Sequence, residues 1–493
     1  MPLTIVSTND TDGIVFAEGT DITVLAGVTV SATALDVSAL QVSSATYNGG
    51  QINILGTLVA DHRGIDIFSN LNFSNSVNGS TIYIGATGQI IAGEIAIALE
   101  DGITASPIIN YGEVFGNTHA IFLDTPSVGA GAFSIQNHGT MSAFLEQTFD
   151  ISANLSGSIV NTGVIANIGS ANVIEMQGGG ALDLNNSGTI SASGDNALVS
   201  ASNTTLNNSG EIDGNVVINA VATIANNGLI TGDVTTTGTA TIANTGLITG
   251  DVSATGAATM TNTGTINGDV TLSGFADTYI GIGQGVVTGE IDLGNGDDTA
   301  TLGNVGGVVR GGFGADTITG GADADEIYGD NQNDLIRGRT GDDIIDGGSG
   351  NDTLRAGQGD DEIMGGTGDD FIRGGAGEDI ITGGQGLDII FGGPGADTFV
   401  YLTESDSPDD NSARDIIQDF EAGDDIIDFT AFAGLSYAGT TAFSGTGPSF
   451  YVSDPNVIGR VKIFVDTDGD GTADMKIILN NVTTALTEDD FLF

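Results

Sequence analysis

Large apolar residues recur at every ninth position in one long stretch of the chain. From 318 to 399, the position two residues after a recurring Asp is always Ile, Leu or Phe. One large apolar residue in nine forms the core of a narrow roll, in which two nonapeptides make one turn. We therefore predict short strands wound around a thin core that contains Ile318, Ile327, Ile336, Ile345, Leu354, Ile363, Ile372, Ile381, Ile390 and Phe399.

The N-terminal part carries a second and longer repeat. A mark of the form Gly-x-aliphatic, often preceded by Asn-x, recurs ten times and is separated by alternating runs such as Ala240-Thr241-Ile242-Ala243. A unit of strand and turn this short cannot bury its apolar face alone, so it must stack on copies of itself as a β-solenoid. The mark glycines are Gly56, Gly88, Gly112, Gly139, Gly163, Gly188, Gly210, Gly228, Gly246 and Gly264.

The Asn of each mark is expected to stack in a ladder at one corner, where Gly would supply a positive φ. A β-sandwich with similar hairpins is the alternative fold. It is disfavoured because the spacing of the marks is constant from Gly210 to Gly264. That spacing equals two nonapeptides, which is one turn of the predicted roll, so we expect both repeats to share one solenoid.

The chain thus divides into three predicted domains. Residues 1–290 form an N-terminal β-solenoid, and residues 291–400 form the nonapeptide roll. Residues 401–493 are not repetitive and carry amphipathic strands at 461–465 and 475–479. The predicted fold class is all-β: a parallel β-solenoid that continues into a parallel β-roll, followed by a C-terminal β-rich domain.

Composition and charge narrow the function. The 493 residues include 10 basic and 64 acidic side chains, a net charge of −54, and no Cys. Such a surface repels nucleic acid and anionic lipid and attracts multivalent cations. Without Cys, disulfides and thiolate metal sites are excluded. The sequence has no apolar run long enough to span a membrane, and Met1-Pro2-Leu3-Thr4-Ile5 does not resemble a cleavable signal peptide.

The nonapeptides follow the pattern G-G-x-G-x-D-x-U-x, in which U is the apolar residue. Gly lets the backbone turn tightly and point carbonyl oxygens inward, while Asp adds a carboxylate, and Ca²⁺ accepts both kinds of oxygen. Mg²⁺ fits poorly because it demands a small octahedron and keeps its waters. A disordered Gly/Asp-rich linker would not keep the apolar period. The predicted calcium ligands are Asp298, Asp316, Asp325, Asp334, Asp343, Asp352, Asp361, Asp370, Asp379, Asp388 and Asp397.

These repeats closely resemble the RTX (repeats-in-toxin) β-roll. Residues 400–493, in particular the run from Arg414 to Phe429 and the acidic-hydrophobic end Asp489-Asp490-Phe491-Leu492-Phe493, resemble the C-terminal domain of serralysin-like and other type I secreted proteins. The resemblance implies export by the type I secretion machinery through an uncleaved C-terminal signal, and an extracellular or cell-surface location. The N-terminal marks resemble those of adhesin β-helices generically.

A further acidic cluster lies at 466–474. Asp466, Asp468 and Asp470 copy the start of an EF-hand loop, but the twelfth position is Ile477 instead of Glu. A calcium-binding hairpin turn and a plain polar turn are both compatible with this pattern.

No enzyme motif was found in residues 1–290. None of His62, His119 and His138 begins H-E-x-x-H, and no G-x-S-x-G occurs. We therefore predict no enzyme and no catalytic residues. The predicted function is that of a secreted calcium-binding structural or adhesive protein, such as a surface layer, matrix filament or adhesin, with self-association and a cell-surface polysaccharide as expected partners. The alternative is a calcium-dependent polysaccharide-active enzyme, a β-helix lyase or uronan epimerase. Arg63 is the single basic residue of this region, which disfavours catalysis on a polyanion.

Overall fold

A computed structural model describes residues 3–5, 8–9, 14–16, 22–32, 39–42, 51–67, 81–100, 104–124, 131–152, 155–409, 413–440, 442–443, 445, 447–453, 459–482 and 484–493. The described chain consists of strands and two 3₁₀ turns, η1 (Glu404–Asp406) and η2 (Glu488–Asp490). It has two compact units, residues 1–256 with 264–268 and residues 257–263 with 269–493. Within the described residues, no helix is long and apolar enough to cross a membrane.

The first unit is a stack of parallel strands in three rows. The first row holds β1 (Leu3–Ile5), β4 (Ile22–Val24), β7 (Gln51–Ile54), β10 (Thr81–Ile84), β13 (Thr104–Asn110), β16 (Gly131–Asn137), β19 (Leu155–Asn161), β22 (Ala181–Asn186), β24 (Asn203–Asn208), β26 (Ala222–Asn226) and β29 (Ala240–Asn244). The second holds β2 (Thr8–Asn9), β5 (Thr29–Ala32), β8 (Thr57–Ala60), β11 (Gln89–Ala92), β14 (Glu113–Gly116), β17 (Thr140–Ala143), β20 (Val164–Asn167), β27 (Leu229–Ile230), β30 (Leu247–Ile248) and β33 (Thr265–Ile266). The third holds β3 (Ile14–Phe16), β6 (Leu40–Val42), β9 (Ile65–Ile67), β12 (Ile95–Glu100), β15 (His119–Asp124), β18 (Phe149–Ile151), β21 (Ile174–Met176), β28 (Val234–Thr236) and β31 (Val252–Ala254). The long strands β23 (Thr189–Ser200) and β25 (Glu211–Ile218) run through the second and third rows.

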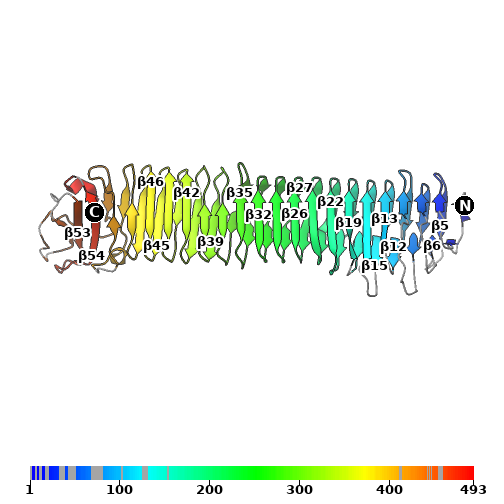
Figure 1. The fold of residues 1–493 in the computed structure, drawn as a ribbon, viewed down its shortest axis with the longest axis horizontal. Coiled ribbons are helices and arrows are strands. Elements are labelled where there is room, and N and C mark those ends of the chain that lie inside the picture. The colour runs from blue at the N-terminus through cyan, green and yellow to red at the C-terminus, as the bar shows by residue number, and fades with distance from the viewer. Residues whose placement is uncertain are drawn as a thin grey trace. The chain divides into compact units, whose positions relative to one another are not determined.

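Each turn of the solenoid buries alternate side chains. In β24, Thr204, Leu206 and Asn208 point inward while the residues between them face solvent. Successive strands of a row pair in parallel and in register, as β19 does with β16 and β22 (Figure 1). The predicted β-solenoid is confirmed, and the sandwich alternative is wrong because the sheets of this unit are parallel.

The predicted asparagine ladder is present at one corner. From Asn110 to Asn226, each mark Asn is buried and donates its side-chain N–H to the side-chain oxygen of the next mark Asn at 2.7–2.8 Å, as in the steps from Asn137 to Asn161 and from Asn161 to Asn186. The same amide also donates to a backbone carbonyl in the following turn. The ladder therefore satisfies polar groups that the corner would otherwise bury unpaired.

The reason for Gly at the marks differs from the prediction. The mark glycines do not have positive φ. At Gly139, a Cβ would overlap the carbonyl oxygen of Gly112 in the turn before, and at Gly163 it would overlap that of Gly139. Gly is therefore required because successive corners approach too closely for a side chain.

The second unit contains two parallel sheets. Sheet A holds β32 (Ala258–Asn262), β35 (Thr278–Gly281), β38 (Thr299–Thr301), β40 (Thr317–Thr319), β42 (Leu335–Thr340), β44 (Thr353–Gln358), β46 (Phe371–Ala376), β48 (Ile389–Phe391), β50 (Ile416–Ile417), β54 (Met475–Val482), β53 (Gly459–Asp466) and β52 (Ser449–Ser453). Sheet B holds β34 (Val270–Leu272), β37 (Glu290–Asp292), β39 (Val308–Phe313), β41 (Glu326–Asn331), β43 (Ile344–Asp346), β45 (Glu362–Thr367), β47 (Ile380–Gln385), β49 (Thr398–Val400), β51 (Ile426–Asp428) and β55 (Phe491–Leu492), with the short β36 (Val286–Val287) between β35 and β37 in the chain.

The nonapeptide roll places one strand per repeat, alternately in sheet A and sheet B. The predicted core residues are all at most 1 % exposed. Within this unit, β32 pairs with β35, β35 with β38 and β38 with β40. Within this unit, the strand that carries the last mark Asn, Asn262, thus continues in register into the roll.

The C-terminal segment extends both sheets of the roll. Strand β50 joins β48 to β54 in sheet A, where β52, β53 and β54 form an antiparallel meander, and β51 joins β49 to β55 in sheet B. Phe429, Phe450 and Phe491 pack against one another under these strands. The predicted strands at 461–465 and 475–479 are confirmed as β53 and β54.

Candidate functional site

The recurring Asp side chains form two buried columns inside the loops of the roll. The first column contains Asp298, Asp316, Asp334, Asp352, Asp370 and Asp388, and the second contains Asp325, Asp343, Asp361, Asp379 and Asp397. All eleven are at most 3 % exposed. The structure therefore brings the predicted residues of each column together, one per turn.

Each carboxylate of a column is fixed by one oxygen. The backbone N–H of Asp334 donates to Oδ1 of Asp352 at 2.7 Å, and that of Asp352 donates to Oδ1 of Asp370 at 2.7 Å. The same bond recurs in the second column, from Asp343 to Asp361 at 2.8 Å. The constant spacing along the sequence thus becomes a ladder in which every Asp receives a hydrogen bond from the turn before.

The other oxygen, Oδ2, is buried without a hydrogen-bond partner in ten of the eleven predicted Asp residues. The exception is Asp325, whose Oδ2 accepts the N–H of Gly321 at 2.6 Å. Its Oδ1 accepts the N–H of Gly307, which stands where the other nonapeptides have the recurring Asp. A buried carboxylate oxygen without a donor is costly, so a row of ten such oxygens indicates that a cation belongs beside them.

Carbonyl oxygens line the same space. A Cβ on Gly347, the first glycine of its loop, would lie 2.6 Å from Oδ2 of Asp352 and 2.6 Å from the carbonyl oxygen of Gly365. The second and third glycines, Gly348 and Gly350, have φ of 91° and 137°, which other residues rarely adopt. The loop thus offers carboxylate and carbonyl oxygens together, the donor set that Ca²⁺ accepts.

The ladders extend beyond the residues that the nonapeptide pattern marks. Asp277 accepts the N–H of Ala258 at one end, and Asp415 and Asp425 accept those of Asp388 and Asp397 at the other. The Oδ2 atoms of Asp277 and Asp415 are also buried without a partner. Sequence analysis missed these three residues because their distances along the chain from their ladder neighbours differ from the constant spacing of the nonapeptides.

Burial controls the electrostatics of the columns. Burial, with a smaller contribution from neighbouring carboxylates, raises the pKa of Asp352 to about 7 and that of Asp334 to about 8. Burial likewise raises the pKa of Asp388 to about 7. Loss of water is a larger cause than repulsion between the carboxylates, because a backbone N–H bonds each carboxylate to the turn before it.

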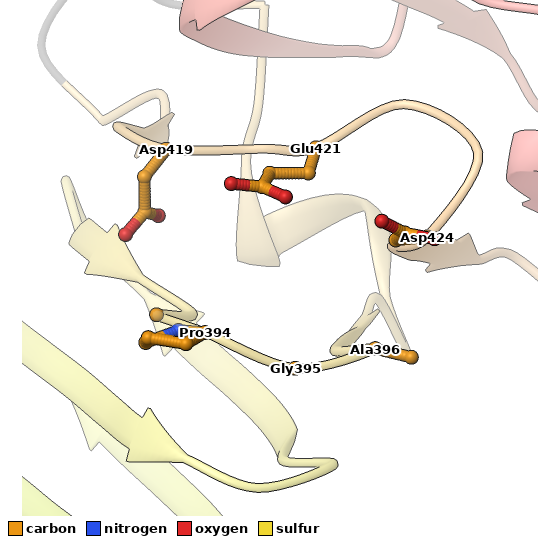
Figure 2. A pocket seen from close by; sticks show the side chains of 7 residues that line it. Pro394, Gly395, Ala396, Asp419, Glu421 and Asp424 are labelled. Atoms are coloured by element: carbon orange, nitrogen blue, oxygen red, sulfur yellow. The ribbon is translucent and has the colours of Figure 1, made fainter.

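A pocket of about 580 Å³ lies where the last nonapeptide loop meets the C-terminal segment. The loop of residues 393–396 forms one wall, and Asp419, Glu421 and Asp424 form the other (Figure 2). Asp419 is held by the N–H of Gly392 at 3.0 Å. Acidic side chains thus face the roll at this end as well.

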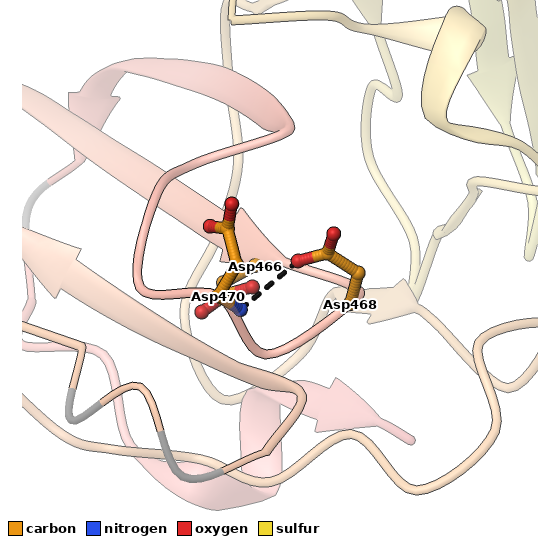
Figure 3. Close-up of side chains that lie close together, drawn as sticks. All are labelled: Asp466, Asp468 and Asp470. Atoms are coloured by element: carbon orange, nitrogen blue, oxygen red, sulfur yellow. Dashed lines mark hydrogen bonds between the residues drawn. The ribbon is translucent and has the colours of Figure 1, made fainter.

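The carboxylates of Asp466, Asp468 and Asp470 meet in the turn between β53 and β54, within 4.8 Å of one another (Figure 3). The two oxygens of Asp466 accept the N–H groups of Gly469 and Gly471 at 2.7 and 2.9 Å. The turn is therefore satisfied by its own backbone at Asp466, while Asp468 and Asp470 are exposed. The structure confirms that the three side chains meet, and their role as ligands stays a prediction.

Sequence analysis also missed an unrepeated cluster on the third row of the first unit. Asp150 and Glu175 are neighbours on β18 and β21. His119 is 5 % exposed, and its Nε2 lies 3.3 Å from Glu146 and 3.7 Å from Asp150. Burial raises the pKa of Asp150 to about 6 and lowers the pKa of His119. No motif links these residues in sequence, because they lie on successive turns of unequal length.

Comparison with known proteins supports the assignment of the loops. The family model described as the RTX calcium-binding nonapeptide repeat matches residues 302–336, 328–363, 337–372 and 364–399. This part of the chain therefore consists of RTX repeats, which bind calcium and are typical of secreted proteins. No curated protein sequence matches the chain.

Among solved structures, we describe one that is similar over part of the chain. It is the solution structure of the AlgE6R3 subunit of the mannuronan C5-epimerase from Azotobacter vinelandii, with 26% identity and a TM-score of 0.21, and the match covers 35% of this chain and 79% of that one. That protein is part of an enzyme. The prediction that this chain is not an enzyme is contradicted by this relative, and we no longer hold it.

Proposed function

We propose that the chain is a calcium-binding protein that folds on calcium outside the cell and has a structural or adhesive role there. The observation that carries the proposal is the row of buried Oδ2 atoms without partners beside inward carbonyl oxygens. Its calcium ligands are the glycine carbonyl oxygens of the loops and the carboxylates of Asp298, Asp316, Asp334, Asp343, Asp352, Asp361, Asp370, Asp379, Asp388 and Asp397. Asp325 is a weaker ligand because both of its oxygens already accept hydrogen bonds.

Calcium, when bound, would supply the positive charge that balances these carboxylates, and the Asp side chains would position it. Each Asp anchors its loop through Oδ1 and offers Oδ2 to the ion. Because the ion binds the folded loops and not the unfolded chain, its binding free energy becomes folding free energy. The buried asparagine ladder and the close-packed glycine corner tie successive turns of the first unit together, which suits a structural role.

Circular dichroism of the full chain tests the proposal. On calcium addition to chelator-treated protein, β signal should rise, and hydrogen exchange should slow in residues 317–400, while magnesium has little effect. Electron microscopy with and without calcium would then show whether copies associate. Full protection of residues 317–400 in excess chelator at neutral pH would contradict calcium-driven folding.

Export forms part of the same proposal. We assign residues 401–493 as a serralysin-like domain that the type I secretion machinery reads, and residues 1–290 as the adhesin-like part. In a host with a type I exporter, removal of 401–493 should leave the protein inside the cell, whereas removal of 1–100 should not. Secretion of the first truncation would refute this assignment.

A polysaccharide-active enzyme is the second candidate, and the cluster around His119 favours it. Hydrolysis of a glycosidic bond uses two carboxyl groups, one of them with a raised pKa that acts as the acid. Asp150 fits the acid. Its neighbour Glu175 accepts N–H groups from Gln147 and Asn172 at 2.7 and 2.9 Å and fits the second carboxylate.

Turnover of polysaccharides by D150N and E175Q tests this candidate. Each variant should lose activity by roughly a hundredfold or more, because each removes one of the two groups. D183N, an exposed Asp on the first row of strands, is the control and should keep activity. Equal activity in all three variants would exclude the cluster.

A further inference from the structure

Sheet A of the roll carries a column of arginines that the calcium sites do not use. Arg337, Arg355 and Arg373 are register partners on β42, β44 and β46. They stand one turn apart, a spacing of about 4.8 Å between neighbouring strands. We call these three residues the arginine column. They amount to three of the 10 basic residues of a chain with a net charge of −54.

The arginine column is accessible and unpaired. Arg355 and Arg373 are exposed, and Arg337 is partly exposed. In the part of the chain that the structure describes, no carboxylate forms an ion pair with any of the three. The strands β40, β42, β44, β46 and β48 contain no acidic residue at all.

Aromatic side chains stand beside the arginines. Phe391 follows Arg373 in the column, and the Arg373 guanidinium lies 4.7 Å from its ring centre and 5.2 Å from that of Phe371. Phe371 belongs to a neighbouring outward column with Leu335 and Ile389. The face thus combines guanidinium groups with apolar surface, and cation–π contacts fix the guanidinium of Arg373 in position.

Sheet B of the same roll shows what an arginine does when it has only a structural role. Arg310 forms ion pairs with Glu290 and Asp330, and its guanidinium covers the ring of Tyr328 at 4.1 Å. Its charge is neutralised within the molecule. The arginine column has no such partners, so its charge is available to a ligand.

We propose that the arginine column binds a linear polysaccharide whose sugars carry carboxylates, with the chain of sugars running along the stack of turns. This proposal rests on the proposed adhesive function, because it names the class of ligand that the protein would adhere to. A guanidinium binds a carboxylate through two parallel hydrogen bonds. A polyuronate repeats one carboxylate per ring at a spacing close to that of the turns, and phenylalanines pack against the apolar faces of such rings.

Other polyanions fit this face less well. Nucleic acid binding draws its affinity from many phosphate contacts, whereas the arginine column offers three guanidinium groups. A second copy of this protein would have to offer one carboxylate per turn. The outward column on sheet B alternates instead, with Glu326 and Glu362 separated by Ile344. The loops do stack one acidic residue per turn at Asp342, Asp360 and Glu378, but Asp342 and Asp360 each already accept a backbone N–H from the next turn.

Binding of a fluorescent polyuronate oligomer to the full calcium-loaded chain tests the inference. The oligomer is short enough not to form a gel with calcium. R355Q/R373Q should weaken binding by roughly tenfold or more, because two guanidinium groups that pair with carboxylates are lost. The control R460Q/K462Q removes the same charge from β53 and should bind like the parent protein.

Three results would overturn the inference directly: no binding by the calcium-folded parent, equal loss in both double variants, or equally tight binding of a single-stranded DNA oligomer. A fourth is unchanged binding in R355Q/R373Q, which would show that calcium bridges the ligand to acidic loops. Circular dichroism of each variant with calcium separates these outcomes from failure of the proposed function, in which the parent chain itself would not fold on calcium.

Discussion

The backbone N–H of Asp334 donates to Oδ1 of Asp352 at 2.7 Å, while Oδ2 of Asp352 is buried without a hydrogen-bond partner. One oxygen therefore holds the turns together and the other is left for a cation. Asp recurs at this position of the nonapeptide because its short side chain carries two oxygens, one for the hydrogen bond between turns and one for the cation.

Replacement of Asp352 by Asn should raise the calcium concentration needed for folding. The Asn side-chain oxygen can still accept the Asp334 N–H, but the charged ligand is lost. We expect the calcium midpoint, followed by circular dichroism, to rise several-fold. The control is D342N. Asp342 is exposed and accepts the N–H of Asp360, and Asn351 plays the same part in the next such pair. Equal midpoint shifts in both variants would contradict the assignment of ligands.

The stability of the calcium-free roll should fall as pH rises. The pKa of Asp352 is about 7 in the fold, and that of Asp334 about 8, against an ordinary value of 3.8. A raised pKa means that the folded state binds the proton more tightly, so its stabilising effect is complete below about pH 4 and is lost as pH rises toward 7 or 8.

Thermal melts in chelator should therefore give a higher Tm at pH 5 than at pH 8. With calcium present the trend should reverse, because the ion requires ionised carboxylates and competes with protons. A chelated protein that is more stable at pH 8 would show that the columns are not buried as described.

Ile345 and Ile344 give a direct test of the register. Ile345 is fully buried, whereas Ile344, next to it on β43, is 37% exposed. I345D would bury a charge in the core without a partner and should cost several kcal/mol or prevent folding. I344D should change the free energy of unfolding by less than about 1 kcal/mol. Similar losses in urea denaturation with calcium would show that the strand is shifted by one residue.

Substitutions at two glycines test whether Gly is required at the corner for close packing or only for backbone flexibility. G139A would drive a Cβ into the carbonyl oxygen of Gly112 and should destabilise the first unit by about 1–3 kcal/mol or more. At Gly307 a Cβ would meet only Leu302, at 3.6 Å or more. G307A should be neutral or stabilise by up to about 1 kcal/mol, since Ala restricts the unfolded chain. A well-tolerated G139A would contradict the account of the corner.

The sequence was sufficient to predict the repeating elements. A period of nine places Ile345 and its equivalents inside the roll, because a coil with constant turn length stacks equivalent positions above one another. The same reasoning predicted the Asp columns. The ladder that contains Asn161 was predicted from the recurrence of Asn two residues before the mark Gly, although its turns are of unequal length.

Only the tertiary structure decided how residues meet when their turns differ in length. His119, Asp150 and Glu175 become neighbours across turns of unequal length, and Asp415 joins a ladder from outside the repeat. The structure also showed that the mark glycines are needed for close contact between turns, and that Oδ2 is the oxygen without a donor. Periodicity determines which turn a residue belongs to, but contacts between side chains depend on the register of neighbouring strands and on burial, and both are set when the turns stack.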